Sequence, residues 1–137
     1  MVTAYIGIGS NLGDRSANID KGVFRLKTTD GIVVKKISTI YETDPVGVPP
    51  QGKFLNGVIE VESALLPSDL LDCLKDIELD LGRVTTERNA PRTIDLVILL
   101  YGDYQMESAH IEIPHPRMRE REFVLRGLRE IAPEVCL

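Results

Sequence analysis

Apolar residues recur along the chain with the two spacings that distinguish strands from helices. Alternating or continuous apolar runs predict strands at residues 3–9, 32–41, 54–62 and 93–101. Apolar positions spaced three and four apart predict helices at residues 15–29, 66–81 and 117–128. The resulting order, β-α-β-β-α-β followed by a helix, predicts a ferredoxin-like α+β domain in which helices pack on an antiparallel sheet in α/β/α layers.

Three segments lack either period. Residues 42–53 read ETDPVGVPPQGK, with three prolines and two glycines. Irregular segments of this length inside a compact domain are usually functional or disordered. Residues 83–92 form a second polar loop, and residues 103–112 predict turns. The second loop contributes three arginines, namely Arg83, Arg88 and Arg92.

The length of 137 residues and the ordinary composition predict a single domain over residues 1–137. The longest apolar run is too short to cross a bilayer, and the N-terminal residues lack the pattern of a signal peptide. The two cysteines fit reduced thiols. We therefore expect a cytoplasmic monomer that binds no membrane, and the net charge of −5 argues against nucleic acid as a partner.

Positive charge is unevenly distributed along the chain. Eight of the ten arginines lie at or after Arg83. Arginine presents a planar, permanently charged fork that grips phosphate oxygens, so the second half of the chain could bind a compact polyanion. The alternative is scattered surface charge, which is what we expect of Arg126 and Arg129.

Asp95 stands in an otherwise apolar predicted strand. A carboxylate in such a place needs a partner, because removing its charge from water is costly. One interpretation is a magnesium ion, which is typically held by one or two carboxylates and phosphate oxygens. The other is a pairing with Arg92 or with a backbone donor. Position 97 would share the face of Asp95 but is Val97, so this strand supplies a single acid.

Two further places could bind a ligand. Phe54 and Asn56 alternate along a predicted strand and could stack on a flat heterocycle and hydrogen-bond its edge, although each could equally be a core or strand-end residue. His115 lies between two prolines and beside arginines, which favours a phosphate site over a structural role.

The glycines match neither a P-loop nor a dinucleotide-binding loop, and zinc-ligand spacing is missing.

Taken in order, several segments resemble one enzyme family over essentially the whole chain. The matching segments are 5–15 (YIGIGSNLGDR), 41–47 (YETDPVG), 54–57 (FLNG), 77–83 (IELDLGR), 91–96 (PRTIDL), 113–117 (IPHPR), 121–125 (REFVL) and 130–134 (EIAPE). Together they make the chain similar to the dihydropterin pyrophosphokinases.

The resemblance implies a reaction, a cofactor and a set of residues. The reaction transfers diphosphate from ATP to 6-hydroxymethyl-7,8-dihydropterin in folate biosynthesis, with Mg²⁺ as cofactor. The pterin-binding positions implied by the resemblance are Thr43, Val46, Phe54, Asn56 and Phe123. The ATP-binding positions are Glu78, Arg83, Arg92, Ile98, His115 and Arg121. The catalytic positions are Arg83, Arg92 and Asp95, and Asp95 is also the implied metal ligand.

The chain departs from the family pattern at several of these places. The family's metal motif is Asp-Leu-Asp, whereas this chain ends the motif with Val97. Asn89 and Ala90 replace a Trp-Gly pair, and His110 replaces an arginine. Three hypotheses follow: an altered copy of an active enzyme, a divergent enzyme with another metal ligand, or a pterin-binding relative with little or no activity. The acids that could supply the other ligand are Asp44, Asp80 and Asp103. A nucleic-acid-binding domain with the same element order is a further alternative.

Overall fold

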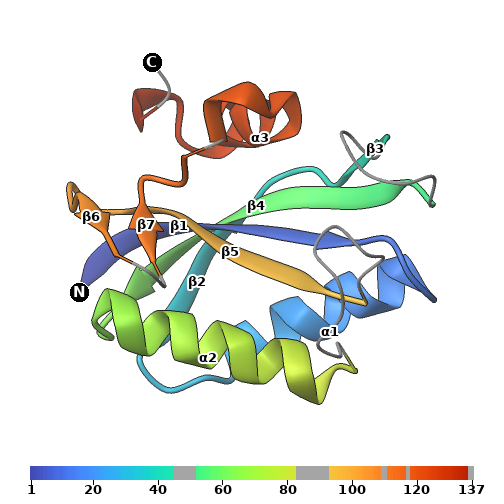
Figure 1. Ribbon diagram of the computed structural model, residues 1–137, viewed down its shortest axis with the longest axis horizontal. Helices are drawn as coiled ribbons and strands as arrows, with labels where there is room; N and C mark the ends of the chain where they lie inside the picture. Colours follow the sequence, from blue (N-terminus) through green and yellow to red (C-terminus); the bar gives the residue numbers. More distant parts are fainter. Residues whose placement is uncertain (45–51, 83–92, 109–110, 117, 136–137) are drawn as a thin grey trace.

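The computed structural model describes residues 1–44, 52–82, 93–108, 111–116 and 118–135 (Figure 1). Within them, one antiparallel sheet has its strands in the order β2 (Ile32–Ile37), β4 (Phe54–Ser63), β1 (Val2–Ser10) and β5 (Asp95–Tyr101). A short strand, β3 (Tyr41–Thr43), pairs with β4 beyond the end of β2. Two interleaved β-α-β units produce this order, so the predicted ferredoxin-like α+β fold is confirmed.

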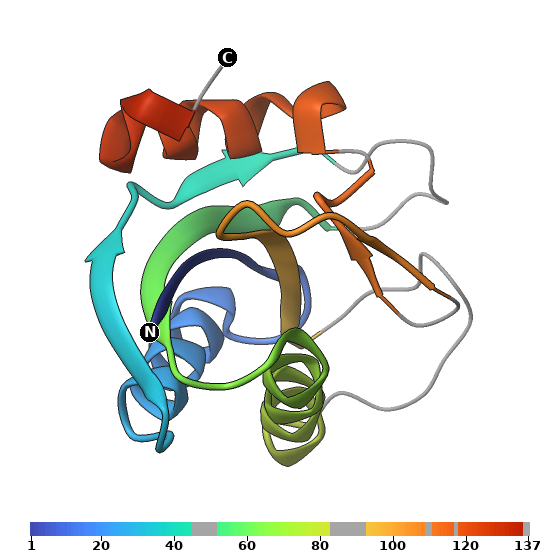
Figure 2. The ribbon, with the colours of Figure 1, turned by 90° about the vertical axis from the view of Figure 1, so that its left-hand side faces the viewer.

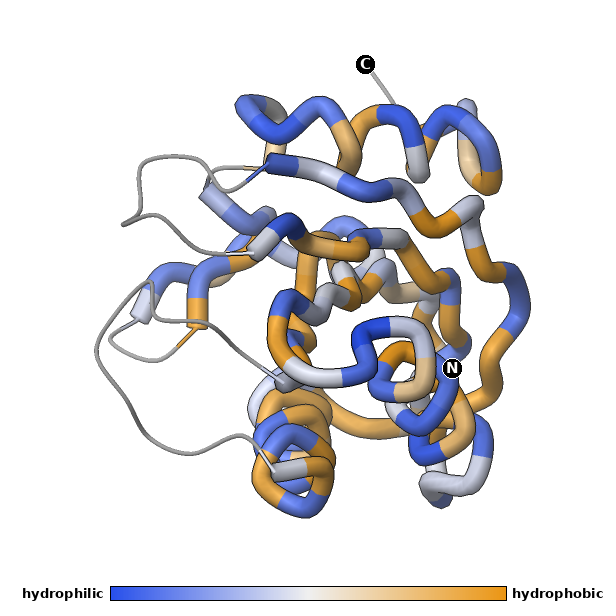
Figure 3. Tube along the Cα trace, turned by 90° about the vertical axis from the view of Figure 1, so that its right-hand side faces the viewer, coloured by the Kyte–Doolittle hydropathy of each residue, from blue (hydrophilic) through white to orange (hydrophobic). Residues whose placement is uncertain are grey.

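Helices cover both faces of the sheet, which confirms the predicted α/β/α layers (Figures 1 and 2). The helices α1 (Arg15–Lys27) and α2 (Pro67–Asp80) pack on one face, where Leu26, Leu70 and Leu74 join a buried cluster with the strands. The helix α3 (Glu122–Ile131) packs on the other face. Figure 3 shows apolar residues, in orange, on the strands between these layers, interspersed with polar ones.

Local sequence explains where the first two helices begin and end. The Asp14 side chain caps α1 by accepting a hydrogen bond from the N–H of Ala17 at 3.1 Å. Pro67 stands at the start of α2, where its missing N–H costs nothing. Gly82 follows α2 with a φ of +99°, a left-handed conformation that stops a helix and that glycine adopts easily.

The predicted continuous strand at 32–41 was wrong, because Ser38 interrupts it. The Ser38 hydroxyl accepts a hydrogen bond from the N–H of Val58 at 2.8 Å, while the Ser38 N–H donates to the Val58 carbonyl at 2.9 Å. A side chain thus replaces one backbone bond of the ladder, and the chain continues as the separate strand β3.

Two other boundaries also differ from the prediction. The segment predicted as turns contains a two-stranded hairpin of β6 (Met106–Glu107) and β7 (Glu112–Ile113). The last predicted helix is divided into a 3-10 turn, η1 (Met118–Glu120), and α3, and a second 3-10 turn, η2 (Pro133–Val135), follows. Such short elements carry too few residues to show a period in the sequence.

Two side chains, the buried Tyr5 and the half-buried Cys73, have perturbed acid–base behaviour. Burial and a 2.8 Å hydrogen bond to Glu60 raise the pKa of the Tyr5 hydroxyl well above its usual range. Burial, followed by the charges of Asp76 and its neighbours, raises the pKa of the Cys73 thiol, which is a free cysteine. Both groups therefore stay neutral at physiological pH. No helix in the described ranges has the length and apolar content to span a membrane.

A cluster between the sheet and α3 holds this helix in place. It includes Val58 from β4 and Val124 and Leu128 from α3. Gly127 lies directly on Val58, since a Cβ at Gly127 would come within 2.6 Å of the Val58 Cγ2 atom. The absence of a side chain at position 127 therefore sets how closely α3 approaches β4.

The substitution Gly127→Ala tests this close approach. Although alanine favours a helix, the added methyl group would meet a buried branched side chain, so we expect the free energy of unfolding to fall by about 1–3 kcal/mol. Chemical denaturation would measure the change. As a control, Arg129→Ala on the exposed side of the same helix should change stability by no more than about 0.5 kcal/mol. Equal stabilities for the two variants would contradict the packing described here.

Candidate functional site

Asp95 and Asn56 lie in one row across the sheet. Asp95 on β5 pairs with Gly9 on β1, Gly9 pairs with Asn56 on β4, and Asn56 pairs with Tyr41 on β3. Directly opposed residues in antiparallel strands point to the same face. Since neighbouring strands lie about 4.8 Å apart, the backbones at Asn56 and Asp95 are separated by about 10 Å.

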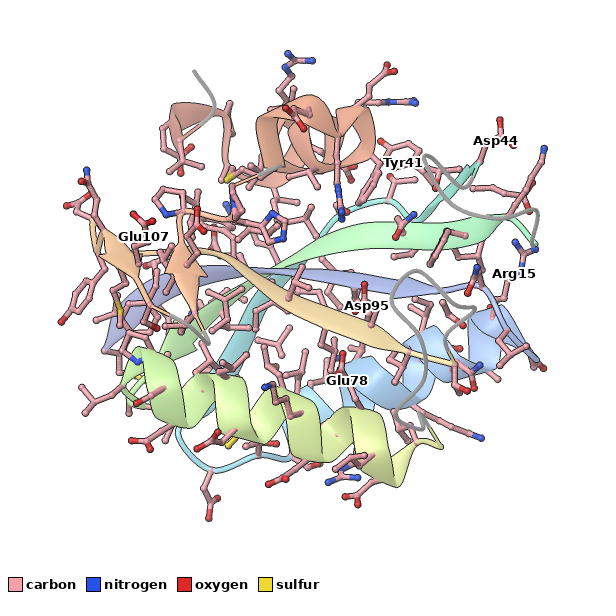
Figure 4. The ribbon with its side chains drawn as sticks, viewed as in Figure 1. Arg15, Tyr41, Asp44, Glu78, Asp95 and Glu107 are labelled. Carbon is pink, nitrogen blue, oxygen red and sulfur yellow. The ribbon has the colours of Figure 1, made fainter. Side chains whose placement is uncertain are left out.

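The row faces α3. Val58 and Val97 belong to the cluster beneath α3, and Asn56 and Asp95 precede them by two residues in their respective strands. Alternation along a strand therefore directs the Asn56 and Asp95 side chains to the same side. Figure 4 shows the Asp95 side chain directed to this side of the sheet. The site thus lies on the face opposite α1 and α2.

Gly9 leaves room for the side chain of Asn56. A Cβ at Gly9 would lie 2.5 Å from the Oδ1 atom of Asn56, a separation that real Cβ atoms essentially never show. The Asn56 Nδ2 group donates to the Thr43 hydroxyl at 2.7 Å, and Asn56 is only 8% exposed. The amide is therefore held over the central strand, between Thr43 and the backbone of β1.

Phe54 and Phe123 both belong to this side of the sheet. Phe54 precedes Asn56 by two residues in β4 and therefore shares its face. Phe123, in the first turn of α3, packs against the cluster that contains Val58. Both rings are half-buried. The structure thus brings together on one face four of the residues predicted from the sequence: Phe54, Asn56, Asp95 and Phe123.

Val97 provides a hydrocarbon surface beside Asp95. Its Cγ2 atom lies 3.0 Å from the place that a Cβ at Gly7 would take, and its side chain packs against the cluster beneath α3. The second position on this face of β5 therefore offers no oxygen ligand. In the described part of the chain, no group of three or more His, Cys, Asp or Glu side chains could hold a metal ion.

The three acids considered as replacements for Val97 are occupied or far from the row. Asp80 forms an ion pair with Arg25 at 2.8 Å. Asp44 has 79% of its side chain exposed and lies 3.7 Å from the Lys53 ammonium group. Asp103 follows the opposite end of β5, about 20 Å away along a strand of this length. The structure therefore gives Asp80 and Asp103 no position beside Asp95, and it leaves Asp44 exposed at the end of β3.

Three of the predicted ATP-binding residues, Glu78, Ile98 and His115, lie along the outer edge of β5. Glu78 on α2 accepts a hydrogen bond from the N–H of Leu96 at 2.8 Å, and it is 8% exposed. The Ile98 side chain is buried among the residues beneath α1 and α2. Residues two apart along an antiparallel strand point their N–H groups to the same edge, so the N–H of Ile98 faces the same outer edge as that of Leu96. The register with β1 shifts after Ile98, which leaves Leu99 as an extra residue in β5.

His115 lies at this outer edge as well. Its backbone N–H donates to the carbonyl of Leu99 at 2.9 Å, so the segment after β7 runs beside β5. Arg121 immediately precedes α3 and is half-buried. Six of the described positions therefore fall into two groups: Thr43, Phe54 and Asn56 on β3 and β4, and Glu78, Ile98 and His115 along β5. Asp95 lies between the groups.

Several predicted residues lie outside the described ranges. These are Val46, Arg83 and Arg92, together with the substituted positions Asn89, Ala90 and His110. Their assignment to pterin binding, ATP binding or catalysis stays a prediction from the resemblance.

Sequence reasoning missed a contact between α3 and β3. Arg126 is exposed, as expected of a surface charge, but its guanidinium carbon lies 4.2 Å from the centre of the Tyr41 ring. Glu130, one turn later, accepts hydrogen bonds from the Thr39 N–H at 3.0 Å and from the Tyr41 hydroxyl at 3.3 Å. The spacing of four residues was the available signal, but it did not reveal the partners.

Comparison with known proteins agrees with this geometry. The model of the family described as 7,8-dihydro-6-hydroxymethylpterin-pyrophosphokinase (HPPK) matches residues 5–133. The 2-amino-4-hydroxy-6-hydroxymethyldihydropteridine pyrophosphokinase of Bacillus subtilis is 46% identical to this chain over 132 residues. These residues cover 96% of this chain and 79% of that protein. The enzyme of the same name from Aquifex aeolicus is 40% identical over 135 residues, or 98% of this chain and 83% of that protein.

Larger proteins also contain a matching region. A folic acid synthesis protein of Schizosaccharomyces pombe is 42% identical over 132 residues, which make up 96% of this chain but 18% of that protein. A Plasmodium falciparum HPPK-DHPS structure with pterin and p-hydroxybenzoate matches with a TM-score of 0.73 and 15% identity, over 97% of this chain and 40% of that chain. This structural match supports the fold, and the sequence matches show that the chain belongs to the HPPK family.

Proposed function

We propose that the chain transfers diphosphate from ATP to the hydroxymethyl group of 6-hydroxymethyl-7,8-dihydropterin, giving AMP and the pterin diphosphate. Membership of the HPPK family supports the reaction. The structural observation that most supports the proposal is the row of Asn56, Gly9 and Asp95 across the sheet. It places a held amide and a carboxylate on one face of the sheet, with a residue that lacks a side chain between them.

Asn56, Thr43 and the two phenylalanines would bind the pterin. An amide side chain has two N–H donors and a carbonyl acceptor, and the bond to Thr43 uses one of them. The second N–H donor and the carbonyl acceptor of Asn56 can pair with the donors and acceptors that alternate on the edge of a pterin. Phe54 and Phe123 would stack on the two faces of the flat ring system. Val46 would add a backbone contact, as the resemblance implies.

Asp95 fits a magnesium ion that arrives with ATP. Magnesium typically takes one or two protein carboxylates, completes its octahedron with phosphate oxygens and water, and rarely uses an all-protein cage. One carboxylate with an apolar neighbour at Val97 matches that donor set. When bound, the ion would neutralise phosphate charge and orient the transferred group.

The edge of β5 would hold the nucleotide. Glu78 fixes the Leu96 peptide group, and the neighbouring backbone groups of Ile98 offer a donor and an acceptor to a planar base. His115 and Arg121 would bind phosphate oxygens, and Arg83 and Arg92 would neutralise further charge on the triphosphate.

The reaction then depends on orientation. With its amide edge at Asn56, a pterin lying along the row would point its hydroxymethyl arm toward Asp95. The hydroxyl oxygen forms a bond to the β-phosphorus of ATP and gives up its proton to water, the bond from that phosphorus to the α-phosphate oxygen breaks, and AMP leaves with that oxygen. Asp95 would orient the hydroxyl group and the phosphates. Holding both reactants in line supplies much of the rate enhancement in such reactions.

The comparisons give no support to a pterin-binding relative without activity, since the bacterial relatives above carry the name of the enzyme. Function as a cytoplasmic monomer is a separate part of the proposal. It rests on size and composition, and light scattering of the purified protein would test the oligomeric state.

The substitution Asp95→Asn tests the role of the carboxylate. It preserves shape but removes the charge, so we expect AMP formation to fall by about 100- to 1,000-fold. The magnesium concentration for half-maximal turnover should rise at the same time. Asp72→Asn, on the exposed face of α2, is the matched control and should retain normal turnover. Normal turnover in the Asp95 variant would contradict the assignment.

The substitution Gly9→Ala tests the position of the Asn56 amide. The new methyl group would displace Oδ1, so we expect the dissociation constant for 6-hydroxymethylpterin to rise by about tenfold or more, equivalent to about 1.4 kcal/mol. Titration of pterin fluorescence would measure this change.

A double variant distinguishes this clash from general damage to the sheet. Asn56→Ala should itself weaken pterin binding, and adding Gly9→Ala should weaken it little further, because the displaced atom is gone. Full additivity of the two changes would argue against contact between these positions.

A further inference from the structure

Arg126 and Glu130 connect α3 to β3, the strand whose Thr43 holds the Asn56 amide. Arg126 lies over the Tyr41 ring at 4.2 Å. Both carboxylate oxygens of Glu130 accept from the Thr39 N–H at 3.0 Å, and one also accepts from the Thr39 hydroxyl at 3.1 Å. The Tyr41 hydroxyl donates to Glu130 at 3.3 Å. We call the contacts of Arg126 and Glu130 with Thr39 and Tyr41 the α3–β3 clamp.

The clamp leads directly to the row of Asn56. Tyr41, which both clamp residues contact, is the residue opposite Asn56 in the pairing of β3 with β4. Thr43, two residues later in the same strand, accepts the hydrogen bond from the Asn56 amide. Since β3 has only three residues, a shift at Tyr41 would be transmitted to Thr43. The position of β3 therefore affects the direction of the Asn56 amide.

The same helix carries the aromatic residue proposed to cover the pterin. Phe123 precedes Glu130 by seven residues, which is about two turns, so the two side chains lie along one side of α3. Phe123 packs inward on the cluster beneath the helix, whereas Glu130 reaches the segment that leads into β3. The clamp thus joins the element that carries Phe123 to the element that positions Asn56.

The clamp contributes less to the stability of α3 than the buried contacts do. Val124 and Leu128 are each 1% exposed and anchor the helix on Val58. Arg126 and Glu130 are exposed. Polar contacts in water contribute modestly to stability, but they fix geometry between elements. Loss of the clamp should leave the helix packed while allowing β3 to move relative to it.

We propose that Arg126 and Glu130 are positioning residues for the pterin, setting the separation between Phe123 on α3 and the Thr43–Asn56 pair on β3 and β4. The inference rests on the proposed function, because it concerns the same site. Neither residue needs to touch the substrate. Their effect reaches it through Tyr41 and β3.

The test compares the variants Arg126→Met and Glu130→Gln with Arg129→Met, which removes a charge from the exposed side of the same helix. Binding of 6-hydroxymethylpterin and of a non-hydrolysable ATP analogue with magnesium would be titrated separately, and melting temperatures would be recorded. In both clamp variants we expect the dissociation constant for pterin to rise by about 5- to 10-fold, the factor expected for the loss of about one kilocalorie per mole of orienting interaction. Affinity for the ATP analogue should stay within about twofold, and melting temperatures should match the control.

Two conservative variants sharpen the result. Arg126→Lys keeps a cation over the Tyr41 ring and should restore part of the pterin affinity lost in Arg126→Met. Tyr41→Phe keeps the ring but removes its hydrogen bond to Glu130, so its effect should be smaller than that of Glu130→Gln. A purely structural role would produce neither the partial rescue nor the restriction to pterin.

The outcomes separate this inference from the proposed function. If the unmodified protein binds pterin and forms AMP but the clamp variants retain normal pterin affinity, the positioning role is overturned and the proposed function stands. Parallel losses of pterin affinity, ATP-analogue affinity and thermal stability would also overturn it, in favour of general destabilisation. If the unmodified protein neither binds pterin nor forms AMP, the proposed function fails, and the inference fails with it.

Discussion

The pairing register of β1 with its two neighbours is the constraint on which the site depends. Gly9 stands opposite Asn56 on one side and opposite Asp95 on the other, and this places the amide and the carboxylate in one row. A slip of one residue in either pairing would move one side chain out of the row, and reversal of a strand's faces would bury the charge of Asp95 against α1 and α2. Gly7 and Gly9 face α3, whereas Ile6 and Ile8 face α1 and α2, so a slip that exchanged the faces of β1 would place isoleucine side chains where Val97 and the Asn56 amide now lie.

Two successive rows on the face of the sheet beneath α3 have different roles. The row of Gly9 is polar and lies at the end of β5 that begins with Asp95, whereas the next row, formed by Val58, Gly7 and Val97, is apolar and supports α3. Glycine occupies the central strand in both rows. In one it accommodates the Asn56 amide, and in the other it accommodates the Val97 side chain. Val97, which stands where the family has an acid, therefore extends the apolar surface beneath α3 by one residue. Asp95 is then the single carboxylate on this face of β5, where the apolar row meets the polar row.

The sequence predicted most of this arrangement because strong periods and unusual residues leave clear signals. The four main strands and the first two helices followed from apolar spacing, and Asp95 was recognisable as a carboxylate in an apolar strand. The division of the second strand was missed because it depends on the Ser38 side chain bonding across to Val58. The contact of Arg126 with Tyr41 was missed because it joins residues distant in sequence, and an exposed arginine has no pattern that distinguishes a partner from solvent. Neighbourhood in the sheet, as between Asn56 and Asp95, also requires a register that periodicity alone does not give.

A crystal structure of the protein with 6-hydroxymethylpterin, magnesium and a non-hydrolysable ATP analogue would show directly whether the row across β4, β1 and β5 holds both substrates. We expect a pterin whose amide edge meets Asn56, whose faces contact Phe54 and Phe123, and whose hydroxymethyl group points toward Asp95. We also expect a magnesium ion bound to Asp95 and to the phosphates, with the nucleotide along the edge of β5. Density for the pterin elsewhere, or for phosphates far from Asp95, would contradict the claim that the row across β4, β1 and β5 brings the two substrates together.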